Sequence, residues 1–147
     1  MISSGLIIAI SALLLAYWFR YTCLLILCTK AERNHASAVA ARHKLAFQGV
    51  REKLATQTGS LDPLARAIER DYAILNRLMA KADGLVEPWP MEDWMLRLNF
   101  AAQRILFWAS RRISVRMAHA ALGEMVGVVE HLAESCGMRM NAQRGSA

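Results

Sequence analysis

Residues 16–30 read AYWFRYTCLLILCTK, and within this stretch a long apolar segment first meets charge. From Ile2 to Phe19 the chain carries no charged side chain, and as a helix this segment would be about 27 Å long. The hydrocarbon core of a bilayer is about 30 Å thick. No basic residue precedes the segment and no small-x-small cleavage site follows it, as a cleaved signal peptide would require. The sequence therefore predicts one transmembrane signal anchor at the N-terminus.

The aromatic residues around Arg20 indicate where this span ends. Aromatic rings and a snorkelling arginine are both satisfied at the level of the lipid headgroups. The interfacial anchor is expected to consist of Tyr17, Trp18, Arg20 and Tyr21, with the hydrocarbon span ending near Phe19. A rival interpretation extends the span to Cys28 with Arg20 inside it, at a cost of roughly 2.5–3.5 kcal/mol. A modest tilt avoids that cost, so the first interpretation is preferred.

Basic residues follow the apolar segment and none precedes it. Under the positive-inside rule this asymmetry places the C-terminal domain in the cytoplasm and the N-terminus outside, in the inner (plasma) membrane. The cations expected to meet lipid headgroups are Lys30, Arg33, Arg42 and Lys44. The three cysteines form no C-x-x-C pair and indicate no disulfide framework, which fits a reducing compartment.

The rest of the chain predicts an all-α fold, with about four helices in total. The first helix is expected to continue from the membrane to about residue 55, and apolar residues at spacings of three and four then predict helices over 61–82, 91–112 and 114–138. Ser114 is the expected N-cap of the last helix. Short connections favour an up-down bundle. The predicted organisation is a transmembrane and interfacial segment over 1–29, a cytoplasmic helical bundle over 30–140 and a flexible tail over 141–147.

The predicted helix over 91–112 is apolar on most sides, apart from arginines at every seventh position. Such a helix is either the central element of the bundle or a helix with an uncovered docking face, and the sequence leaves both interpretations open. In the second, the uncovered strip is formed by Phe100 and Phe107 with Leu96 beside them. The preceding connector is expected to return towards the bilayer. The residues expected to meet a partner are Leu96, Phe100, Phe107, Trp89 and Trp94.

Small residues indicate two further packing surfaces. In the span they recur at spacings of four, three and four, and a face of this kind lets helices associate in lipid. The predicted membrane packing face consists of Gly5, Ala9, Ala12 and Ala16. In the last helix, Gly123 and Gly127 suggest close contact with another helix.

No pattern of catalytic or metal-ligating residues is present in the sequence. Glu32 and His35 form one E-x-x-H, whereas a di-iron bundle needs two such motifs and further glutamates. We therefore expect no catalytic site, metal or cofactor. The net charge of +6 is explained by membrane contact and a solvated helix face, so no nucleic-acid partner is expected. Acylation of Cys23 or Cys28 is left open.

These observations favour a non-enzymatic single-pass membrane protein whose helical domain binds partners, as a scaffold, assembly or accessory subunit of a membrane complex. Its partners would be the lipid bilayer and a membrane protein or a second copy of the chain. The alternative is a self-associating protein that binds anionic lipid at the cytoplasmic membrane surface through the basic residues 20–53.

Overall fold

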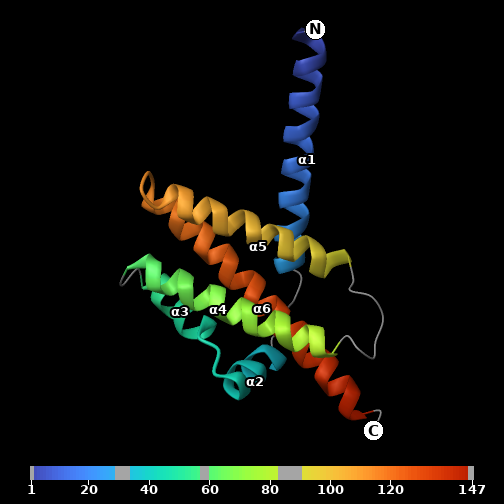
Figure 1. Ribbon diagram of the computed structural model, residues 1–147, viewed down its shortest axis with the longest axis vertical. Coiled ribbons are helices and arrows are strands. Elements are labelled where there is room, and N and C mark those ends of the chain that lie inside the picture. The colour runs from blue at the N-terminus through green and yellow to red at the C-terminus, as the bar shows by residue number, and fades with distance from the viewer. Residues whose placement is uncertain (1, 29–33, 57–59, 83–90, 146–147) are drawn as a thin grey trace. The chain divides into compact units, whose positions relative to one another are not determined.

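The computed structural model describes residues 2–28, 34–56, 60–82 and 91–145, and over these residues it is helical, without strands. The all-α prediction is confirmed, but these residues form six helices and not about four (Figure 1). The chain divides into two compact units, Met1–Ala31 and Glu32–Ala147. The helices are α1 (Ile2–Cys28), α2 (Asn34–His43), α3 (Phe47–Ala55), α4 (Leu61–Ala82), α5 (Met91–Ser110) and α6 (Val115–Gly145).

The first unit consists of α1, which is long and apolar enough to cross a membrane over the 24 residues Gly5–Cys28. The helix runs without a break through Arg20, as predicted, and continues beyond Phe19, where the hydrocarbon span is expected to end. The Thr22 hydroxyl donates to the Trp18 carbonyl oxygen at 2.8 Å, so this polar side chain is satisfied within its own helix.

The predicted single helix from the membrane to residue 55 is wrong, because α2 ends at His43 and Lys44 follows in a left-handed conformation. Lys44 has φ 52°, and the Leu45 N–H donates to the Ala40 carbonyl oxygen at 3.0 Å. This hydrogen bond and the left-handed residue together form a Schellman motif, which ends α2 at His43. Glycine is the usual residue at such a position, and a lysine there gives no sequence signal for a helix end.

A buried carboxylate fixes the start of α3. Asp71 on α4 is fully buried and accepts a hydrogen bond from the backbone N–H of Ala46, the residue just before α3. Burial raises the pKa of Asp71, and the backbone N–H groups of Ala46 and Phe47 partly offset the rise. The side chain of Asp71 therefore replaces the intrahelical partners that the first N–H groups of a helix lack.

The centre of the second unit is α6, which packs against α2, α3, α4 and α5 (Figure 1). It begins as predicted at Ser114, whose hydroxyl accepts a hydrogen bond from the Met117 N–H at 3.4 Å. It extends past the predicted end at 138 to Gly145, through part of the predicted tail. Its buried apolar side chains include Ala118, Leu122, Met125, Val128, Val129, Leu132 and Cys136.

Close contact between α6 and α2 occurs at Gly137. A Cβ at this position would lie 2.7 Å from the Cβ of His35 and 3.1 Å from a methyl group of Val39, so only glycine fits. The glycines Gly123 and Gly127 are predicted to make close helix contact, within the bundle or between copies. A Cβ at Gly123 would meet nothing within 4 Å, so Gly123 makes no such contact among the described residues of the domain, and contact between copies stays a prediction.

Candidate functional site

The residues expected to form an uncovered strip on the 91–112 helix are buried. Leu96 is 0% exposed, Phe100 2% and Phe107 0%. Phe100 stacks on Tyr72 of α4 with ring centroids 3.9 Å apart, and Phe107 meets Trp108 edge to face. Of the two interpretations of this helix, the uncovered strip is contradicted for these three side chains, which fill the contact between α5 and its neighbours as the core interpretation predicts. Trp94 is exposed, and Trp89 lies outside the described residues.

The uncovered apolar surface of α5 lies on its other side. Trp94 is 61% exposed, Leu98 46% and Ile105 68%. At about 100° per residue, these and four further exposed apolar residues fall within an arc of about 100° around the helix. We call this set the α5 stripe: Met91, Trp94, Leu98, Ala101, Ala102, Ile105 and Ala109.

The buried side of the same helix carries several polar residues. Asn99 is 3% exposed and Gln103 is 4% exposed, and each has a side-chain atom without a hydrogen-bond partner among the described residues. Asp93 is also buried and accepts a hydrogen bond from Arg139 on α6 at 2.8 Å. Helix α5 thus buries four polar side chains together with four apolar ones, while its apolar stripe remains uncovered. On a typical surface helix the apolar residues face the core and the polar residues face solvent.

More exposed apolar side chains follow where α5 connects to α6. Ile113 is the most exposed of them at 87%, and Val115 and Met117 are also exposed. An isolated exposed apolar side chain is ordinary on a protein surface, whereas a contiguous group marks a site of interaction. The helical spacing makes the α5 stripe such a group.

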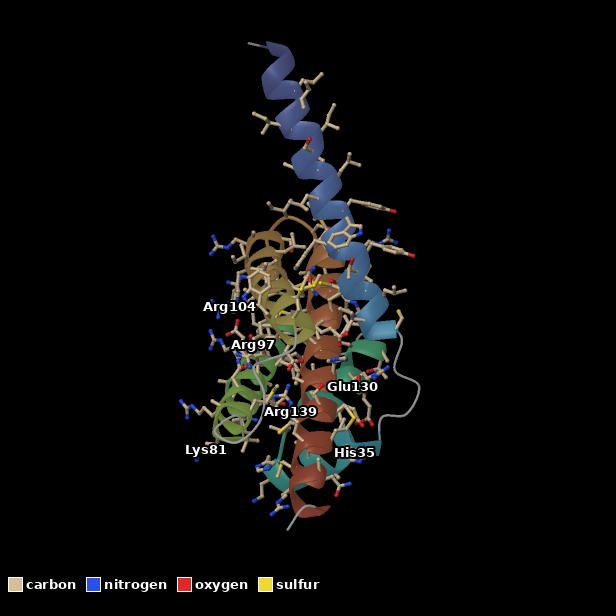
Figure 2. All side chains as sticks on the ribbon, turned by 90° about the vertical axis from the view of Figure 1, so that its right-hand side faces the viewer. His35, Lys81, Arg97, Arg104, Glu130 and Arg139 are labelled. Carbon is tan, nitrogen blue, oxygen red and sulfur yellow. The ribbon has the colours of Figure 1, made fainter. Side chains whose placement is uncertain are left out.

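Arginines border the α5 stripe along one edge. Arg97 and Arg104 lie seven residues apart on the same side of α5 (Figure 2). Arg111 donates to Asp62 at 2.5 Å and stacks over the ring of Trp108, so it is held within the domain. Arg104, Arg112 and Arg116 are exposed.

Among the residues that the structure describes, acidic groups are sparse around the stripe. Residues 94–123 contain none. The exposed Glu92 lies about 130° around the helix from the centre of the stripe. Glu69 on α4 accepts a hydrogen bond from the Trp108 indole N–H at 3.0 Å. The surface beside the stripe is therefore cationic.

A second candidate site is a cavity of about 260 Å³ between α2 and α6, with polar groups contributed by His35, Arg42, His43 and Asn141. His35 approaches Glu134 of α6, with its Nδ1 at 2.8 Å from the carboxylate. The same carboxylate accepts hydrogen bonds from the backbone N–H groups of His35 and Ala36. Glu134 therefore caps α2, a role that the sequence analysis missed because the two residues are 99 positions apart.

The cavity contains no recognisable catalytic constellation. A Glu–His pair can orient a general base, but among the described residues no serine, threonine or cysteine lines this cavity. Within the described ranges, no group of three or more histidine, cysteine, aspartate or glutamate side chains could hold a metal ion. Glu32, the other half of the E-x-x-H, lies outside those ranges.

The remaining predicted residues fall on two elements. The small residues of the predicted packing face and the predicted interfacial anchor all lie on α1. Arg42, in the last turn of α2, lines the cavity, and Lys44 is the left-handed residue that follows. Lys30 and Arg33 lie outside the described residues. Among the described residues of the second unit, Arg42 and Lys44 therefore lie at the end of α2, and not on α5.

No family model, curated protein or solved structure matches the chain.

Proposed function

We propose that this protein is a non-enzymatic single-pass membrane protein whose helical domain docks through the α5 stripe. In this proposal α1 spans the inner membrane as a signal anchor, with the second unit on the cytoplasmic side. The small-residue face of α1 associates with a partner helix in the bilayer. The protein then acts as a scaffold or accessory subunit of a membrane complex.

The observation that carries the proposal is that α5 leaves an apolar stripe uncovered while it buries polar side chains. The domain buries Asn99 and Gln103, which costs free energy where their polar groups lack partners. It leaves Trp94, Leu98 and Ile105 uncovered. Covering the α5 stripe would bury apolar surface, and each Å² buried contributes about 25 cal/mol of favourable free energy. An arrangement that is unfavourable for an isolated domain becomes favourable once the stripe is docked.

The span is supported by the composition of α1, and its orientation by the cations that follow it. The apolar side chains along α1, such as Leu6, Ile8 and Leu13, are exposed, which suits a helix whose surroundings are lipid. The basic residues lie after α1 in the sequence, so the positive-inside rule places the second unit in the cytoplasm.

The experiment is site-specific photo-cross-linking of the full chain in its own membranes. A photoreactive amino acid replaces Ile105 in the α5 stripe, and a matched control replaces Ala73, an exposed position on α4. We expect abundant adducts, with protein or with lipid, from position 105 and few from position 73. Equal or absent labelling at the two positions would show that the stripe is not a docking surface.

A further inference from the structure

We propose that the occupant of the α5 stripe is the anionic surface of a lipid bilayer, with Arg104, Arg112 and Arg116 contacting the lipid phosphates. This inference rests on the proposed function, because it names what the α5 stripe docks against.

The shape and composition of α5 suit a helix that lies in the plane of the membrane. Its 20 residues make a rod about 30 Å long. The stripe runs along this rod and includes Trp94, whose indole ring is typical of the level of the headgroups. Helices of this type lie at the interface with the apolar face in the acyl boundary and the cations among the headgroups.

The charges distinguish an anionic lipid surface from the other possible occupants. The thirty residues 94–123 contain five arginines and no acid, and three of these arginines are exposed. A second copy of the chain docked stripe to stripe would bring like charges together, because a two-fold contact pairs the same patch on both copies. Lipid phosphates supply the opposite charge without a dedicated acidic partner.

The length of chain between α1 and α2 keeps the domain near the membrane if α1 spans it. Only residues 29–33 separate the two helices, and a fully extended chain of five residues reaches about 18 Å. A tether this short gives the domain a high effective concentration at the surface, so a weak affinity of the stripe for lipid is sufficient.

The test uses the full chain with Cys23, Cys28 and Cys136 changed to alanine and with Ile105→Cys carrying an environment-sensitive fluorophore. The labelled protein is reconstituted into phosphatidylcholine vesicles with and without phosphatidylglycerol, each containing brominated lipid. We expect several-fold stronger quenching when phosphatidylglycerol is present, and loss of that increase at high ionic strength. A second chain with the fluorophore at Ala73→Cys on α4 should show little quenching in either vesicle.

A combined variant, Arg104→Gln with Arg112→Gln and Arg116→Gln, tests the role of charge. These side chains are exposed, so the helical content should stay the same by circular dichroism, while quenching at position 105 should fall to the level seen without phosphatidylglycerol. Quenching that is equal at positions 105 and 73, or unchanged in the triple variant, would overturn the lipid inference.

The two proposals fail in different ways. Protein adducts from position 105 in native membranes, without quenching in vesicles, would leave the α5 stripe as a docking surface and identify its occupant as a protein, including a second copy. Absence of both adducts and quenching would remove the proposed function together with the inference.

Discussion

Helices α5 and α6 are both rich in apolar residues, yet they use them differently. Every residue of α6 from Leu132 to Gly137 is buried, because four other helices pack against α6. On α5 the apolar residues divide between a buried side, with Phe100 and Phe107, and an exposed stripe. Apolar content alone therefore does not identify a core helix. The face that stays uncovered, and the polar residues buried opposite it, indicate which helix has a further role.

The sharpest test of this comparison is truncation of one large apolar side chain on each helix. Leu132 is fully buried, so Leu132→Ala should lower the free energy of unfolding by about 2–5 kcal/mol. Ile105→Ala on the α5 stripe should change it by less than about 0.5 kcal/mol. Denaturant unfolding of the full chain in detergent measures both. Similar losses for the two variants would show that the stripe is part of the core.

Substitution of the glycine at the close contact between α6 and α2 should have a smaller effect on the free energy of unfolding, and a second glycine on α6 serves as a control. Gly137→Ala would place a Cβ against the Cβ of His35, which cannot swing away, and should destabilise the domain by about 1–3 kcal/mol. Gly123→Ala on the same helix meets open space and should stabilise it by up to about 1 kcal/mol. Thermal unfolding distinguishes the two. If Gly137→Ala left the melting temperature unchanged, α2 would not approach α6 as described.

The free energy of unfolding should also depend on pH through Asp71, which is fully buried. Burial raises the pKa of this carboxyl above its ordinary value of 3.8, so the folded state binds the proton more tightly than the unfolded state. Its contribution to stability is therefore present below pH 3.8 and is lost as the pH rises through the folded pKa. Asp71→Asn should remove this part of the pH dependence of the melting temperature. A variant whose profile parallels that of the parent would contradict the assignment.

The smallest effect on stability is expected for polar substitutions in the α5 stripe. Leu98→Ser and Ile105→Ser affect exposed side chains, so each should change the free energy of unfolding by less than about 0.5 kcal/mol. Together they should reduce photo-cross-linking from a probe at Trp94, since they remove much of the apolar surface of the stripe. Unchanged cross-linking in the double variant would show that the apolar side chains of the stripe do not mediate docking.

Much of the helical pattern could be predicted from the sequence. The helix over 61–82 is confirmed at both ends, because its apolar residues recur at regular spacings of three and four. The start of α6 is confirmed because Ser114 has the side chain that an N-cap requires. Signals of this kind are local, and they lie within a few residues of the feature that they determine.

The features that were missed depend on residues far apart in the sequence. The end of α2 depends on a lysine in a left-handed conformation, and the start of α3 on the carboxylate of Asp71 on another helix. On α5, apolar residues occur almost all round, so the sequence left the buried side undetermined. The partners supplied by α4 and α6 turned Phe100 and Phe107 inward, and Asn99 and Gln103 became buried with them.

The most direct test is thiol accessibility at position 105 in open sheets of the protein's own membrane, where reagent reaches both faces. The full chain carries Ile105→Cys, or Ala73→Cys on α4 as the control, with the native cysteines changed to alanine. If the α5 stripe is docked, a water-soluble maleimide should label position 105 much more slowly than position 73, and detergent should remove the difference. Equally fast labelling of the two positions in the intact membrane would contradict the account.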